Sequence, residues 1–200
     1  MAARPHDEEK AKRILTAVRK ILAQKGYMGT TVNQVAQEAG VSRGLLHYYF
    51  KNKDEMLARA IKENMDLSIR MIRRVFAQYH DPQGISKGIV DLLRNVMETD
   101  PDFLGLFFEG FAVARNSPVV QAELAGLYGQ FRKALEQGLG KAKADGIISP
   151  ALPVNALAAI ITGLIDGIGL QLLTEPDLNG NQVIWDSIET GIADLLVDTR

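Results

Sequence analysis

The chain has no cysteine, so disulfides and thiolate metal sites are excluded. Its three histidines, His6, His47 and His80, lie far apart in the sequence, and we predict no metal site from them. No segment has the alternating pattern of a strand, and neither a phosphate-binding loop nor a nucleophile elbow is present. We therefore expect neither an enzyme nor a bound cofactor.

The sequence also lacks an apolar leader, because its first ten residues are rich in charge. This and the absence of cysteine predict a cytoplasmic protein. Of the 200 residues, 46% are hydrophobic and 24% are charged, as in soluble globular chains with a sizeable core. Residues 1–62 carry 12 Lys+Arg against 6 Asp+Glu, although the net charge of the whole chain is −1. This basic end favours a polyanionic partner, and a merely solvated basic surface is the alternative.

Apolar residues recur at helical spacing along the chain, and pairs such as Asp81-Pro82 and Asp100-Pro101 interrupt the runs. The pattern predicts an all-α fold of about nine helices. A helix over residues 8–25 ends at Gly26, and a long connecting helix begins at Asn52. We expect two domains, a three-helix unit over residues 1–51 and a larger helical body over residues 52–200.

The stretch from Thr30 to Phe50 carries a dense set of helix start and stop signals. Thr31 is a predicted N-cap, with Gln34 as its partner in a capping box. Gly40 stands where a helix C-cap needs a left-handed residue, and Ser42 is a second N-cap. These signals predict two short helices joined by a tight turn.

Such a pair is the arrangement with which helix-turn-helix proteins place their second helix in the DNA major groove. Arg43 lies at the start of that helix, and arginine can pair with guanine O6 and N7. The alternative is that the polar residues are solvated surface, since glycine corners between helices also occur in other folds.

The segment TTVNQVAQEAGVSRGLLHYYFKNKDEML resembles the N-terminal signature of TetR-type transcriptional regulators. The signature is long and specific, and it covers about the first quarter of the chain. The residues that match it are Thr31, Val35, Ala36, Ala39, Gly40, Val41, Ser42, Gly44, Leu46, Tyr49, Phe50, Lys53 and Met56 or Leu57.

The resemblance implies a homodimer that binds double-stranded DNA through its N-terminal helices and a small molecule through its body. His47 departs from the family, which usually has tyrosine at that position. By analogy the residues nearest the bases are Asn33, Arg43, Gly44, Leu45 and His47, and those near phosphates are Thr31, Ser42, Tyr48, Tyr49 and Lys53.

The segment from Ala156 to Leu173 is almost wholly apolar. Its length is borderline for a bilayer, and Asp166 lies in its middle, so we predict a buried helix and no membrane partner. By family analogy it forms a dimer interface with the last helix, and an ordinary core helix is the alternative. The residues predicted at the interface are Gly163, Gly167, Leu170, Ile188 and Ile192.

A ligand site is predicted around the aromatic run that follows Pro101, because ligand pockets are mostly apolar with a few polar groups. Carboxylates in apolar helices need a partner, such as an arginine or a cationic ligand. The predicted ligand-binding residues are Phe103, Phe107, Glu109, Phe111, Tyr128 and Asp166.

The sequence and the resemblance together predict a regulator, expected to be a repressor, that a small-molecule ligand releases from a palindromic operator. The body also resembles BetI-like and AcrR-like members, without indicating which ligand binds. Two alternatives stay open: a helical small-molecule binding protein without operator-specific DNA binding, and a non-specific DNA-binding protein.

Overall fold

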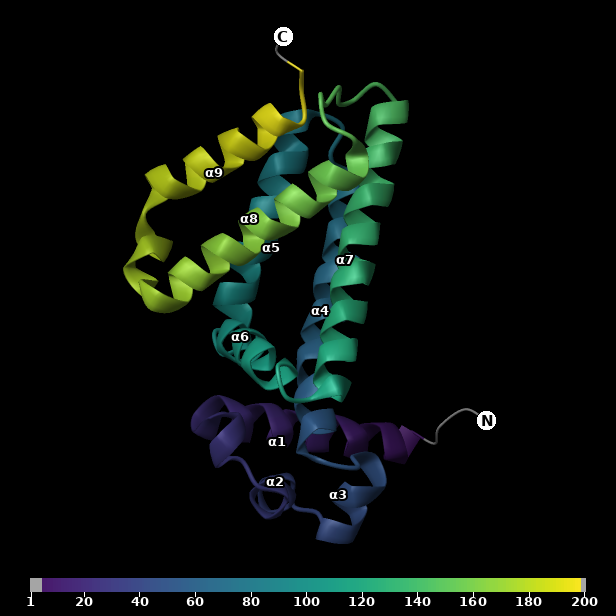
Figure 1. Cartoon of the computed structure of the whole chain (residues 1–200), viewed down its shortest axis with the longest axis vertical. Helices are drawn as coiled ribbons and strands as arrows, with labels where there is room; N and C mark the ends of the chain where they lie inside the picture. Colours follow the sequence, from purple (N-terminus) through teal and green to yellow (C-terminus); the bar gives the residue numbers. More distant parts are fainter. Residues whose placement is uncertain (1–4, 199–200) are drawn as a thin grey trace. The chain divides into compact units, whose positions relative to one another are not determined.

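The structure is a computed structural model that describes the backbone of residues 5–198 (Figure 1). Within that range it contains nine α-helices, one short 3-10 helix and no strand, which confirms the predicted all-α fold. The α-helices are α1 (Pro5–Gly29), α2 (Val32–Ala39), α3 (Arg43–Tyr49), α4 (Lys53–Gln78), α5 (Pro82–Thr99), α6 (Phe103–Ala114), α7 (Pro118–Ala144), α8 (Val154–Thr174) and α9 (Gln182–Leu195), and the 3-10 helix is η1 (Pro176–Gly180).

The chain forms two compact units, and the long helices α4 and α7 each contribute to both. Unit 1 holds the residues up to Asn64 together with Gly105–Gly126, and unit 2 holds Met65–Leu104 and the chain from Leu127 onward. The N-terminal helices therefore share a unit with most of α6 and the start of α7. The boundary that we predict at residue 51 is set by the helix-turn-helix pattern and stays a prediction.

The core of unit 1 includes buried residues of α1, α2, α3 and the first turns of α4, and α1 packs against α2. Ile14, Val18 and Leu22 are buried on α1, as their spacing predicts, and Leu46 is the buried residue of α3. The α1 helix has non-helical backbone angles at Gly26 (φ 66°), which confirms the predicted break there. Tyr27 therefore begins a separate short turn that leads into α2.

The core of unit 2 includes the contact between α5 and α9, where Ile89 and Trp185 are buried. The hydroxyl of Ser86 donates to the main-chain oxygen of Glu189, which ties the two helices together. Helices α4 and α7 approach closely in this unit. A Cβ added at Gly138 would lie 2.1 Å from the ring of Phe76.

The apolar helix α8 differs from its prediction, because only 33% of its most apolar window is buried. The mean hydropathy of that window is 1.9, and by length and composition alone α8 is long and apolar enough to cross a membrane. Unit 2 covers one side of this helix, where Leu157 and Ile161 are buried. A helix that is apolar all round therefore keeps an apolar face that the described chain leaves open. The large exposed side chains on that face are Ile160, Leu164, Leu170 and Leu173.

Candidate nucleic-acid interface

Local hydrogen bonds fix both ends of α2 as the sequence predicts. Thr31 Oγ1 accepts the main-chain N–H of Gln34 at 3.3 Å, and Gln34 Oε1 accepts the N–H of Thr31 at 3.0 Å. This reciprocal pair is the predicted capping box. Gly40 follows with φ 61° and ψ 39°, a left-handed conformation that side chains disfavour.

The start of α3 is capped by Ser42, whose Oγ accepts the N–H of Leu45 at 3.1 Å. Because only Leu46 of this short helix is buried, most of its surface faces solvent. Arg43 donates from Nε to His47 Nε2 at 3.4 Å, so these two exposed side chains lie together one turn apart. Tyr48 is 82% exposed and makes an edge contact with the ring of Tyr49. The helix thus presents cationic and hydrogen-bonding groups on a rigid, capped element.

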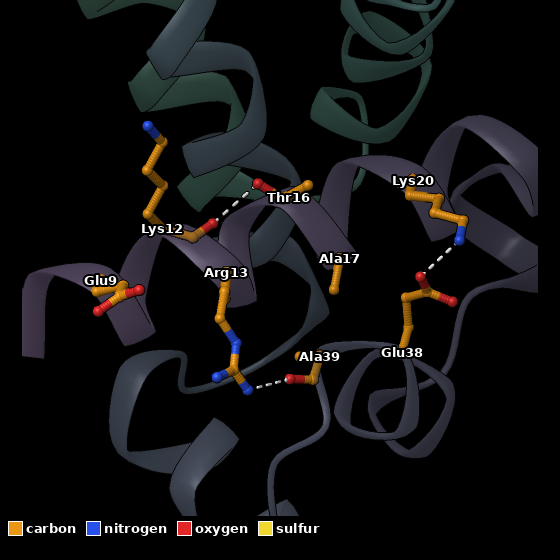
Figure 2. Close-up of a pocket in the computed structure, with 8 residues that line it drawn as sticks. All are labelled: Glu9, Lys12, Arg13, Thr16, Ala17, Lys20, Glu38 and Ala39. Carbon is orange, nitrogen blue, oxygen red and sulfur yellow. Dashed lines mark hydrogen bonds and ion pairs between the residues drawn. The ribbon is translucent and has the colours of Figure 1, made fainter. Parts of the chain in front are cut away.

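Two polar contacts hold α2 against α1, and Figure 2 shows both. Arg13 donates from Nη2 to the main-chain oxygen of Ala39 at 2.9 Å, and Lys20 pairs with Glu38 at 2.6 Å. They span a groove of about 510 Å³ between the two helices, which Lys12 and Thr16 also line. These contacts hold the last turn of α2, just before the turn into α3, against α1.

The predicted DNA-binding residues gather on unit 1 and differ in exposure. Leu45, Tyr49 and Lys53 are half-buried. Lys53 donates from Nζ to the main-chain oxygen of Tyr27 at 2.7 Å. The exposed members of the predicted set are Thr31, Asn33, Ser42, Arg43, Gly44, His47 and Tyr48.

The predicted ligand-binding residues divide between the two units. Tyr128 and Asp166 come together in unit 2, where the tyrosine hydroxyl donates to Asp166 Oδ2 at 2.6 Å. Burial raises the pKa of both Tyr128 and Asp166. The hydrogen bond between them raises the pKa of Tyr128 further, whereas it partly offsets the rise in the pKa of Asp166. Asp166 is therefore a half-buried carboxylate whose ionised form is disfavoured.

The other predicted ligand residues have different surroundings. Glu109 accepts the main-chain N–H of Tyr27 at 2.5 Å, within unit 1. Phe107 is buried and makes an edge contact with Phe111, which is 39% exposed. Phe103 is buried in unit 2.

The residues predicted at the dimer interface also differ in exposure. Gly163, Gly167 and Leu170 are exposed on α8, and Ile188 is half-buried on α9. Ile192 is only 1% exposed, so its side chain packs inside unit 2. The open apolar surface of this region lies mainly on α8, and α9 adds Val183, which is 73% exposed.

The sequence-based prediction missed a cluster of polar residues around Tyr27. Asp54 and Ser117 are hydrogen-bonded to each other, and Asp54 also accepts the hydroxyl of Tyr27. The only local signal was Gly26, which predicts the end of a helix but not what lies against it. The partners are 27 and 63 positions apart in the chain, so no short motif could have joined them.

A capped helix pair braced by a third helix, with an exposed second helix, is the arrangement of a helix-turn-helix DNA-binding unit. Residues 14–60 match the family model of bacterial regulatory proteins of the tetR family. Residues 82–197 match the model of the C-terminal part of BetI-type transcriptional repressors. The chain belongs to the TetR family of transcriptional regulators, and it is a regulator rather than an enzyme.

A curated relative agrees with this assignment, and solved structures share the fold. The chain is 24% identical to the transcriptional repressor AcnR of Corynebacterium efficiens over 90% of each chain. Its fold is similar to that of GusR from Salmonella enterica, with a TM-score of 0.81 and 20% identity over 94% of this chain and 95% of that one. FadR from Bacillus subtilis, solved with stearoyl-CoA, gives a TM-score of 0.78 and 18% identity over 92% and 97%.

Proposed function

We propose that the protein is a cytoplasmic homodimeric repressor that binds a palindromic operator and leaves it when a small molecule binds its body. The exposed face of the capped helix α3 is the observation that carries this proposal. The major groove is about 12 Å wide and admits one α-helix. Two such helices in a dimer would read half-sites one DNA turn, about 34–36 Å, or a multiple of it apart.

Within α3, we assign base contacts to the side chains nearest its start. Arg43 is the main reader, because its guanidinium can donate two hydrogen bonds to one guanine. The surface proposed to face the bases also includes Gly44, Leu45 and His47 of α3, together with Asn33 of α2. The residues proposed to contact phosphates are Thr31, Ser42, Tyr48 and Tyr49.

The open face of α8 supports dimerisation. This face exposes Leu164, Leu170 and neighbouring apolar residues. Covering it with a second copy removes apolar surface from water and so lowers the free energy of the dimer. A membrane is the weaker occupant, because the half-buried Asp166 would bring a carboxylate to bilayer depth. Gly163 and Gly167 are exposed and have no neighbour within 4 Å of an added Cβ, so a partner helix can approach closely there.

The ligand response is proposed to act through population shift. An effector that binds one arrangement of the dimer more tightly than another moves the population toward it. If that arrangement has the wrong spacing between the two α3 helices, the operator is released. The hydrogen-bonded pair of Tyr128 and Asp166, within unit 2, is the group that we propose to face the effector.

The test is selection of duplexes from a random pool, followed by binding in the presence of competitor DNA. The expected product is a palindromic site that the wild-type protein binds with salt-dependent affinity. Arg43→Ala should relax the preference at one base position in each half-site, by about 1–3 kcal/mol. Retention of no duplex by the wild-type protein would refute operator binding and leave only the ligand-binding alternative.

A further inference from the structure

The backbone break at Gly26, within α1, is held by four side chains from outside that helix. Gly26 takes φ 66°, and Tyr27 follows it. We call the four residues around Tyr27 the Tyr27 clamp, and all belong to unit 1. They are Lys53, Asp54, Glu109 and Ser117.

The clamp engages every polar group of Tyr27. Its N–H donates to Glu109 Oε1 at 2.5 Å, and its main-chain oxygen accepts Lys53 Nζ at 2.7 Å. Its hydroxyl donates to Asp54, whose other oxygen accepts Ser117 Oγ at 2.5 Å. The Lys53 ammonium also lies 4.1 Å from the centre of the Tyr27 ring, within the range of a cation–π contact.

Gly26 and the carboxylate of Glu109 lie close together. A Cβ there would lie 3.1 Å from Glu109 Oε1, so glycine serves both the positive φ and the approach of the carboxylate. Burial raises the pKa of Tyr27 to about 12, helped by the bond to Asp54. The hydrogen bond from Ser117, and then that from Tyr27, lower the pKa of Asp54. Asp54 is thus held as an anion that accepts two hydroxyl donors.

Tyr27, which the clamp holds, lies shortly before the helix pair that carries the proposed DNA contacts. Thr30 donates from Oγ1 to the main-chain oxygen of Gly26 at 2.7 Å, and Thr31 caps α2. The N–H of Thr30 also donates to the main-chain oxygen of Tyr27 at 3.3 Å, so the turn at Gly26 and Tyr27 is tied to the start of α2. The ammonium of Lys53 contacts the main-chain oxygen and the ring of Tyr27. A lysine that binds a DNA phosphate would instead direct its ammonium toward solvent.

We infer that the Tyr27 clamp positions the helix pair for DNA binding, and that Lys53 acts through Tyr27 rather than as a phosphate ligand. The inference rests on the proposed operator binding. It replaces the role that the family resemblance implies for Lys53, and it makes Glu109 and Ser117, far outside residues 1–51, determinants of DNA affinity.

The salt dependence of binding separates the two roles of Lys53. A lysine that neutralises one phosphate contributes about 0.9 to the slope of log K against log salt concentration, and its removal lowers the slope by that amount. A positioning lysine leaves the slope unchanged while the affinity falls. The probe is a duplex that the wild-type protein selects from a random pool, with a random-sequence duplex as the non-specific reference.

We expect Lys53→Met to weaken binding of the selected duplex about tenfold, as for loss of a charge-assisted hydrogen bond, with an unchanged slope. Glu109→Ala should weaken it similarly, and Glu109→Gln should restore binding because the amide oxygen can still accept from Tyr27. Lys53→Met and Glu109→Ala together should weaken binding less than the product of the two effects. Lys51→Met, an exposed lysine outside the clamp, is the matched control.

Circular dichroism and melting of each variant show that it is folded before its affinity is compared. A slope lowered by about 0.9 in Lys53→Met would overturn the inference and restore the phosphate role. Unchanged affinity in folded Glu109→Ala would also overturn it. Both results leave operator binding intact, whereas a wild-type protein that selects no duplex would refute operator binding and the inference together.

Discussion

Arg13 on α1 donates from Nη2 to the main-chain oxygen of Ala39, the last residue of α2, at 2.9 Å. The bond spans 26 positions of the chain and is partly buried. The carbonyls of the last helical turn have no partner within their own helix, and a guanidinium is a strong donor for one of them. This pair therefore couples the bracing helix to the turn that precedes α3.

Arg13→Met should lower both stability and operator affinity. The substitution keeps most of the aliphatic volume and removes the donor, which costs about 1–3 kcal/mol when the acceptor stays buried. The melting temperature should fall by about 2–4 °C for each kcal/mol. Lys12→Met, at an exposed neighbour, is the control. Equal melting temperatures for the two variants would show that the bond to Ala39 is not a structural tie.

Gly138→Ala should destabilise unit 2, because an added Cβ would lie 2.1 Å from the ring of Phe76. Overpacking of this kind costs about 1–3 kcal/mol. Gly140→Ala lies in the same helix, meets nothing within 4 Å, and should be neutral or stabilising by up to about 1 kcal/mol. Thermal melts of the two variants provide the comparison. A Gly138→Ala protein as stable as Gly140→Ala would mean that α4 and α7 are farther apart than described.

Asp166→Asn should stabilise the ligand-free protein at neutral pH. Burial raises the pKa of Asp166 in the folded state, so the ionised carboxylate costs folding free energy. The cost grows as pH rises from the unfolded pKa, about 3.9, through the higher folded pKa. Asparagine keeps an acceptor for Tyr128. The stability advantage of the variant should therefore disappear at acidic pH, where Asp166 of the wild type is also uncharged. Chemical unfolding at several pH values measures this, and an advantage independent of pH would contradict it.

Asp54→Asn should change stability at neutral pH in the opposite direction, by destabilising the protein. Hydrogen bonds from Ser117 and Tyr27 lower the folded-state pKa of Asp54, so its anion stabilises the fold. This stability is present above the unfolded pKa of about 3.9 and is lost as pH falls through the lower folded pKa. The variant should therefore unfold more easily than the wild type at neutral pH, and the difference should shrink in acid. A stabilised Asp54→Asn would refute the described hydrogen bonds.

Leu170→Glu should convert the proposed dimer to a monomer. Leu170 is 49% exposed on α8, and a carboxylate there would have to be desolvated when the face is covered. Val119→Glu, at a similarly exposed position at the start of α7, should leave the assembly unchanged. Sedimentation at micromolar concentration measures both. A Leu170→Glu protein that stays dimeric would place the interface elsewhere.

Local signals were enough to predict the helix pair. Thr31, Gln34, Gly40 and Ser42 act on backbone groups within four residues, so their roles follow from the sequence alone. The same holds for the buried faces of α1 and α5, whose apolar residues repeat at helical spacing. The fold class and the family therefore needed no coordinates.

Contacts between distant segments could not be predicted from the sequence. Glu109 was predicted to face a ligand because its carboxylate lies in an apolar helix, and the structure gives it the N–H of Tyr27, 82 positions away. Burial of α8 was predicted from composition, which cannot say how many sides of a helix its own chain covers. Tyr128 and Asp166 were each predicted as polar members of an apolar site, but their mutual bond depends on how α7 meets α8.

The sequence contains a single tryptophan, and its ring packs where α5 meets α9. Trp185 is 2% exposed, donates from Nε1 to the main-chain oxygen of Asn179 at 2.9 Å, and has the Arg94 guanidinium 4.9 Å from its ring centre. Its fluorescence is therefore an intrinsic, label-free probe of unit 2 that is silent about the helices proposed to touch DNA. A change in its emission on adding a compound would report an event in the body, and could serve as a screen for the effector without any knowledge of the operator.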